Sequence, residues 1–204
     1  MCGRYALQCT AEKLRQRYDL PYEAFEGLNF SPSEEIFPSG QAPVILPENQ
    51  EHSQKRLALY HWGFSPSFAS SLIINARGES VESKPTFRDS FYNQRCLVPV
   101  TSFYEWQDTN KGKIKYKISL KKEDLFSLAA IYKVYQTDDG KSRPSYCIIT
   151  TSAVRKIKPI HPRMPVILSP AEEKIWLNPT EKNTTRLKKC LTESGKKELV
   201  LQAQ

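Results

Sequence analysis

Hydrophobic and polar positions alternate, or hydrophobic residues run together over short stretches, along most of the chain after residue 40. Both patterns are typical of β-strands, half buried in the first case and fully buried in the second. The turn-forming sequences NKGK and DDGK separate neighbouring stretches, as in antiparallel hairpins. We predict strands within residues 42–47, 56–64, 72–77, 95–106, 114–120, 125–135, 145–152, 164–168 and 198–202.

Three segments carry helical signals instead. Thr10 is a suitable N-cap for a short helix within residues 10–20. Phe87 and Phe91 are four residues apart and would share one face of a second helix. Residues 169–172 read S-P-A-E, a capping box with proline at the first helical position, so a third helix should begin there. We therefore predict an α+β, mainly β class: an antiparallel or mixed, barrel-like β domain with a few peripheral helices.

Length and composition narrow the fold further. The chain has 204 residues, 39% of them hydrophobic, which suits one core and a single domain over residues 1–204. No hydrophobic run is long enough to span a membrane, and we expect no signal peptide. The five cysteines form no CxxC, which argues against a disulfide framework and a zinc knuckle and favours a reducing compartment, the cytoplasm. The three histidines have no partner four residues away, so we expect no catalytic metal and no cofactor.

The net charge is positive. The sequence has 30 Lys and Arg residues and 22 Asp and Glu residues, which gives a net charge of +8 and a pI near 9.2. This excess suits a polyanion such as nucleic acid. Part of it lies in a Lys-rich segment near the C-terminus that has the pattern of a solvated helix face. Charge alone therefore favours nucleic acid only slightly.

Position two of the chain is a cysteine. If Met1 is removed, Cys2 carries a free α-amine and a thiol on adjacent carbons, with reference pKa values of about 8 and about 8.5. The amine can form a Schiff base with an aldehyde, and the thiol can then close on the imine to give a thiazolidine. Two alternatives are a small start residue without a role and a lipid attachment site, but the latter needs a preceding apolar segment that the sequence lacks.

A few polar residues interrupt the hydrophobic runs. Asn75 and Arg77 stand where a predicted strand leaves the core. Glu105 lies between two aromatic residues, where burial would raise the pKa of its carboxyl toward that of a general acid or base. The alternative is simple alternation, with Glu105 facing water. His161 lies in a proline-rich loop and has either a catalytic role or an exposed position without one.

The segments MCGRY, NARGE, FYEW and HPRMP occur in this order. Together they resemble the SRAP (SOS response-associated peptidase) family, which contains the sensor of abasic sites in single-stranded DNA. The resemblance covers nearly the whole chain, from Cys2 through the VIL after HPRMP. It implies that Cys2, exposed by methionine removal, is the nucleophile and that Asn75 positions its α-amine. Glu105 would act in proton transfer, with His161 as the second acid or base.

The resemblance also implies a DNA-binding surface. Arg4, Arg77 and Arg163 would bind backbone phosphates, and Asn29 and Pro32 match the family's N-x-x-P loop beside the site.

Two positions depart from the family pattern. Ser102 replaces the usual glycine before FYEW, which could shift the local backbone slightly. The loop after W-G-x-x-P reads SPSFASS, which leaves Phe68 as the stacking residue where relatives often carry tryptophan. A phenylalanine ring offers a base less stacking area than a tryptophan ring, so we expect weaker binding to DNA.

The function implied by the resemblance is capture of abasic sites. Cys2 would form a thiazolidine DNA–protein crosslink that shields the lesion, with minor lyase activity and autoproteolytic removal of Met1. The expected partner is single-stranded DNA containing abasic sites, bound by a monomer that joins the bacterial nucleoid during DNA damage. An N-terminal-nucleophile cysteine peptidase or amidohydrolase, and a module that binds single-stranded DNA without covalent chemistry, are the alternatives.

Overall fold

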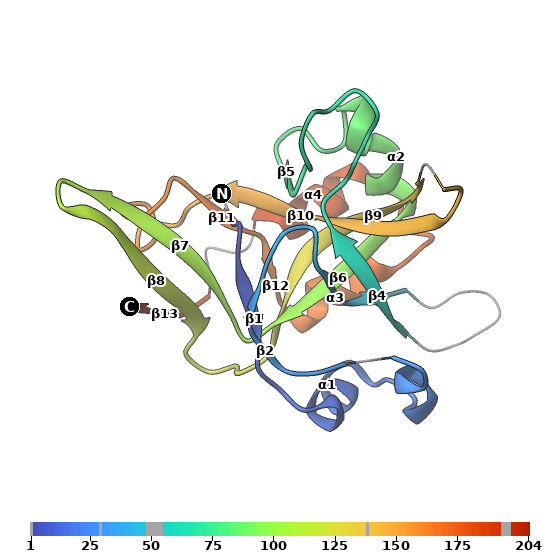
Figure 1. The fold of residues 1–204 in the computed structure, drawn as a ribbon, viewed down its shortest axis with the longest axis horizontal. Helices are drawn as coiled ribbons and strands as arrows, with labels where there is room; N and C mark the ends of the chain where they lie inside the picture. The colour runs from blue at the N-terminus through green and yellow to red at the C-terminus, as the bar shows by residue number, and fades with distance from the viewer. Residues whose placement is uncertain (1, 29, 48–54, 138, 193–196) are drawn as a thin grey trace.

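The computed structural model describes residues 2–28, 30–47, 55–137, 139–192 and 197–204. Within these ranges the chain forms thirteen β-strands, four α-helices and one short 3-10 helix (Figure 1). None of these helices is long and apolar enough to cross a membrane. The predicted α+β, mainly β class is confirmed.

Five strands close into a barrel: β3 (Gln41–Leu46), β4 (Arg56–Trp62), β6 (Arg95–Val100), β9 (Phe126–Gln136) and β10 (Ser142–Ser152). β10 pairs with β4, β4 with β3, β3 with β6 and β6 with β9, and β9 returns to β10. Only the β4–β10 pair among these is parallel. Closure pairs the edges of the sheet with each other, and hydrophobic side chains fill the interior.

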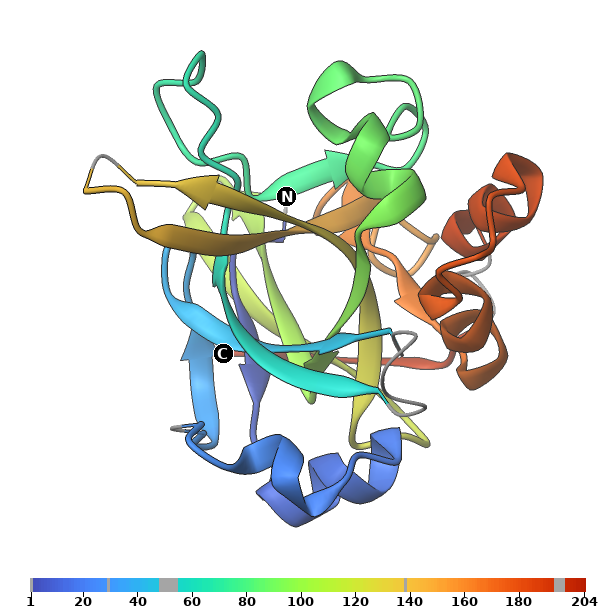
Figure 2. The same cartoon turned by 90° about the vertical axis from the view of Figure 1, so that its right-hand side faces the viewer.

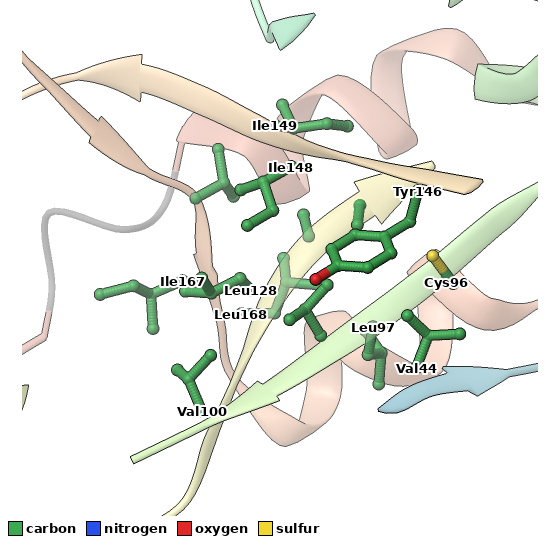
Figure 3. Close-up of a cluster of buried hydrophobic side chains, with 14 of the residues drawn as sticks. Val44, Cys96, Leu97, Val100, Leu128, Tyr146, Ile148, Ile149, Ile167 and Leu168 are labelled. Carbon is green, nitrogen blue, oxygen red and sulfur yellow. The ribbon is translucent and has the colours of Figure 1, made fainter. Parts of the chain in front are cut away.

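Part of this core is drawn in Figure 3. Leu97, Leu128 and Ile148 come from three different barrel strands and pack together with Tyr146. The Tyr146 hydroxyl is satisfied within the core, because it lies 2.6 Å from the Tyr5 hydroxyl. The barrel is therefore a solid scaffold on which the outer strands can be held.

Three short strands pair with the last two strands of the barrel. β5 (Asn75–Arg77) pairs in parallel with β10, and β11 (Arg163–Pro165) pairs antiparallel with it. β12 (Ile167–Leu168) pairs with β9. The NARGE and HPRMP segments thus reach the same part of the molecule through β10, although the sequence separates them widely.

A second sheet of five antiparallel strands contains the start of the chain. Its order is β13 (Leu199–Ala203), β8 (Gly112–Leu120), β7 (Ser102–Thr109), β1 (Tyr5–Leu7) and β2 (Ser33–Ile36). The β7–β8 hairpin and the β9–β10 hairpin point toward opposite ends of the molecule (Figure 1). β1 also packs against β6, which places the N-terminal segment between the second sheet and the barrel.

The three helices predicted from sequence are confirmed. Thr10 caps α1 (Ala11–Tyr18) by accepting a hydrogen bond from the backbone N–H of Lys13, and Ser169 and Glu172 form both halves of a capping box at α3 (Pro170–Leu177). α4 (Thr184–Thr192) lies in the Lys-rich segment that has the pattern of a solvated helix face, and the structure adds η1 (Tyr22–Phe25). With α2 (Pro85–Asn93), helices α3 and α4 lie outside the barrel on one side, whereas α1 lies below the sheets (Figure 2).

Candidate active site

Cys2 is fully buried at the entry to β1. Its Sγ lies 3.8 Å from the backbone oxygen of Arg4. Burial raises the pKa of the thiol well above its ordinary value, and the nearby carboxylate of Glu105 raises it further. The thiol is therefore protonated at neutral pH.

Asn75 connects the start of the chain to the barrel. It begins β5, which is held against Ile148 of β10. Its Nδ2 donates a hydrogen bond of 2.9 Å to the backbone oxygen of Cys2. Its Oδ1 is buried and accepts no hydrogen bond from the part of the chain that the structure describes. Asn75 thus holds the main chain of Cys2 and keeps a buried acceptor beside it.

Glu105 lies on β7, next to the N-terminal segment. The two segments are joined by a hydrogen bond of 2.9 Å from the backbone N–H of Tyr104 to the backbone oxygen of Arg4. Glu105 is 2% exposed, so the alternative in which simple alternation turns it to water is wrong. Burial raises the pKa of its carboxyl to about 7. Both protonation states are therefore populated at neutral pH, as a general acid or base requires.

His161 stands beside this carboxyl. Its Nδ1 lies 4.0 Å from Oε1 of Glu105, and the side chain is 25% exposed, so this loop histidine is partly accessible to solvent and also close to the buried carboxyl. The same nitrogen lies 3.0 Å from both the backbone nitrogen and the backbone oxygen of Arg163. The backbone of Arg163 therefore offers this nitrogen both a donor and an acceptor, which fixes the orientation of the ring.

Arg77 and Arg163 lie close together along β10 but differ in their partners. Arg77 is exposed and ends β5 opposite Thr150. Arg163 donates two hydrogen bonds, of 2.5 and 2.9 Å, to the carboxylate of Glu79 and a third of 2.7 Å to the backbone oxygen of Thr150. Arg77 is open to a ligand, whereas Arg163 already binds a carboxylate.

Arg4 is also paired. Its guanidinium donates a hydrogen bond of 2.8 Å to Glu35 and lies over the rings of Phe37 and Trp106, 4.3 and 5.0 Å from their centroids. Stacking of this kind fixes the plane of the guanidinium. The predicted phosphate-binding residue is therefore held rigidly beside the reaction centre.

Among the remaining predicted residues, Pro32 and Phe68 lie on loops. Pro32 is exposed, and Phe68 is 74% exposed, as a stacking residue should be. Asn29 lies outside the described residues. Ser102 is buried in β7 with extended backbone, since positive φ among the described residues other than glycine is confined to Asp19 and Ser39. The departure from glycine therefore introduces no strain of the left-handed kind.

Sequence reasoning missed the carboxylates that pair with the arginines. Glu79 stands inside the NARGE segment and could have been noticed there, but nothing in the sequence connects Glu35 to Arg4, because only the pairing of β1 with β2 brings them together. Among the described residues, no three His, Cys, Asp or Glu side chains are grouped so as to hold a metal ion.

Known proteins resemble this chain over most of its length. The family model described as SOS response associated peptidase (SRAP) matches residues 1–203. The abasic site processing protein YoqW of Bacillus subtilis (strain 168) is 36% identical over 90% of this chain and 82% of its own length. The abasic site processing protein HMCES of Gallus gallus is 28% identical over 94% of this chain and 69% of its own length.

A solved structure has the same fold. The crystal structure of a protein from Bacteroides thetaiotaomicron superposes with a TM-score of 0.82 at 27% sequence identity, covering 99% of this chain and 91% of its own. Since the family model and the relatives both span most of the sequence, the chain belongs to the SRAP family.

Proposed function

We propose that this protein recognises abasic sites in single-stranded DNA and captures them as a thiazolidine crosslink at Cys2, after removal of Met1. The observation that carries the proposal is the convergence on Cys2 of Asn75 and Glu105 from β5 and β7, with His161 beside Glu105. The names of the relatives, abasic site processing proteins, support the substrate.

The state of the thiol decides the order of the chemical steps. Because burial keeps Sγ protonated, the neutral α-amine is the group that attacks first. It adds to the aldehyde of the ring-opened sugar, and loss of water gives an imine. The S–H bond then adds across the C=N bond, sulfur to carbon and hydrogen to nitrogen, which closes the five-membered ring. No oxidant or cofactor is needed, because the atoms balance with water as the only product released.

Glu105 and His161 supply the proton transfers. The protonated carboxyl of Glu105 can give a proton to the leaving hydroxyl, and the ionised form can take one from the amine. The buried Oδ1 of Asn75 is an acceptor for an N–H of the α-amine, since its Nδ2 already holds the same residue. His161, in contact with Glu105, would restore its protonation state between steps.

The DNA strand would bind through phosphates and one stacked base. Arg77 is an exposed cation two residues from Asn75, and Phe68 is an exposed aromatic ring. Backbone phosphates make such binding salt-dependent, and stacking needs an unpaired base, which favours single strands.

The imine intermediate also permits β-elimination, so we propose a minor lyase activity. Peptidase chemistry at Cys2, including removal of Met1 by the protein itself, is the competing proposal, and the family's printed name favours it. The raised pKa of the thiol weighs against it, because a protonated thiol is a poor nucleophile. The five free, buried cysteines suit the cytoplasm, where we place the protein as a monomer.

A denaturing gel with abasic single-stranded DNA separates these functions. A band shift that resists heat and denaturant supports capture at Cys2. Hydrolysis of peptides without a shifted band would support the peptidase, and binding that is lost on denaturation would leave a non-covalent DNA-binding module.

A further inference from the structure

A charged cluster lies on the second sheet, beside the reaction centre but outside it. Its centre is Glu35 on β2, whose two carboxylate oxygens bind two different cations. Oε2 accepts a hydrogen bond of 2.8 Å from Arg4, and Oε1 accepts a short one from Lys115 on β8. All three side chains are between 24% and 29% exposed, so solvent and ligands can reach them.

Aromatic rings hold both cations in place independently of Glu35. Arg4 lies over Phe37 and Trp106, as described above, and the Nζ of Lys115 lies 4.3 Å from the ring centroid of Tyr104. The two positive groups are therefore kept close together by the sheet, at a distance that a single anion can bridge.

The anion that bridges them has the geometry of a phosphate. A backbone phosphate of DNA presents two non-bridging oxygens, which can accept hydrogen bonds from two cations as the two oxygens of a carboxylate do. The site carries two positive charges and one negative charge, so it retains an excess that favours a further anion. Ion pairs of this exposure contribute little to stability, and breaking the contacts of Glu35 is correspondingly easy.

We propose that Glu35 occupies a phosphate site. When single-stranded DNA binds, a backbone phosphate next to the captured nucleotide displaces the carboxylate of Glu35 and bridges Arg4 and Lys115. Lys115 is then a further DNA-binding residue, and Glu35 is a competitor that weakens binding. Since Arg4 is two residues from Cys2, this phosphate belongs to the strand close to the lesion. The inference rests on the proposed function for its ligand.

The test uses single-stranded DNA without an abasic site, titrated by fluorescence anisotropy at several salt concentrations. We expect Glu35→Gln to tighten binding severalfold, because the competitor loses its charge while the side chain keeps its shape. We expect Lys115→Gln to weaken binding severalfold and to lower the log–log salt slope by about 0.7, the share of one phosphate contact on a single strand.

Two matched controls measure the effect of charge alone. Glu12→Gln removes a carboxylate that pairs with Arg15 on α1, at the far end of β1 from the chain's start (Figure 1). Lys113→Gln removes a lysine two residues from Lys115 on the same strand, paired with Asp108. Thermal melts establish that all four variants fold.

Three results would overturn the inference. If Glu35→Gln binds no tighter than Glu12→Gln, Glu35 does not compete with DNA, and if it binds more weakly than wild type, Glu35 positions the cations instead. A salt slope for Lys115→Gln equal to that for Lys113→Gln would remove Lys115 from the interface. Because the oligonucleotide has no lesion, a failure of crosslinking on abasic DNA would refute the proposed function without deciding this question.

Discussion

Cys2 and Cys96 are both fully buried cysteines in very different surroundings. For Cys96, on β6, burial raises the pKa of the thiol with no other cause, and the side chain lies in the hydrophobic cluster drawn in Figure 3. For Cys2, burial also raises the pKa of the thiol, but two polar side chains lie beside it. Asn75 donates a hydrogen bond to its backbone oxygen, and the buried carboxylate of Glu105 raises the pKa of the thiol further. Burial by itself therefore does not distinguish the proposed nucleophile, Cys2, from Cys96, whereas the neighbouring polar groups do.

The largest expected effect is loss of crosslinking in Cys2→Ala. Only Cys2 can offer both an α-amine and a thiol, so this variant should form no stable adduct with abasic single-stranded DNA while keeping most of its affinity. Cys96→Ala should crosslink at the wild-type rate and lose about 1 kcal/mol of stability. A denaturing gel with thermal melts checks both.

Cys2→Ser sharpens the same comparison, since it should give an imine that borohydride traps but no stable thiazolidine. An adduct that survives in Cys2→Ala and disappears in Cys96→Ala would reverse the assignment.

The next effect concerns the rate of capture in Glu105→Gln. The amide keeps the shape of the side chain but carries no proton, so crosslinking should slow by about one to three orders of magnitude at unchanged DNA affinity. The wild-type rate should also change with pH near 7, where Glu105 titrates, and the variant should lose that inflection. Single-turnover assays across pH measure this. Unchanged crosslinking rates of Glu105→Gln at every pH would show that Glu105 takes no part in proton transfer, and this difference between Cys2 and Cys96 would have no catalytic effect.

The same carboxyl should make folding stability depend on pH. Burial raises the pKa of this carboxyl from 4.5 to about 7 in the folded protein, so below about pH 4.5 it is protonated in both the folded and the unfolded protein. As pH rises from about 4.5 toward 7, the carboxyl ionises first in the unfolded protein, and the free energy of unfolding decreases. At about 1.4 kcal/mol per pKa unit, the wild type should lose up to about 3 kcal/mol relative to Glu105→Gln between these values. Denaturant unfolding at several pH values tests whether the free energy of unfolding of the wild type falls relative to that of Glu105→Gln as pH rises. Parallel stability curves for the two proteins would contradict the raised pKa.

The smallest effect separates the two arginines beside β10. Arg77 is exposed, so Arg77→Ala should weaken single-strand binding and lower the salt slope by about 0.7. Arg163 must first leave Glu79, so Arg163→Ala should change affinity and slope less. Anisotropy titrations at several salt concentrations compare them. An equal loss in both variants would show that the ion pair with Glu79 does not limit Arg163.

Local signals in the sequence were enough to predict three of the helices and most of the strands, but not β1 and β2. The capping box at Ser169 and the N-cap at Thr10 are local patterns, and the structure has both. Alternation could not decide whether Glu105 faces in or out, because its neighbours Tyr104 and Trp106 are compatible with either. Its burial depends on the packing of β7 against the N-terminal segment, which is a tertiary property.

A barrel-like domain was predicted, but the partners of its strands and the pairs made by the arginines could not be predicted, for a related reason. Pairing of β4 with β10 joins residues far apart in the chain, and no local pattern specifies the partner. The contacts of Glu35 need four strands of the second sheet, β2, β1, β7 and β8, to be in register before they form. The four motifs predicted which residues take part in the chemistry. Which carboxylates pair with the arginines depends on the tertiary fold.

The most direct test is the intact mass of the protein after mixing with abasic single-stranded DNA, followed by peptide mapping. We expect the free protein to have the mass of a chain that begins at Cys2. We expect the complex to gain the mass of the oligonucleotide less one water, with the attachment at Cys2 and none at Cys96. A covalent adduct at any other cysteine, or no adduct with a protein that begins at Cys2, would contradict the proposed role of Cys2 and its neighbours.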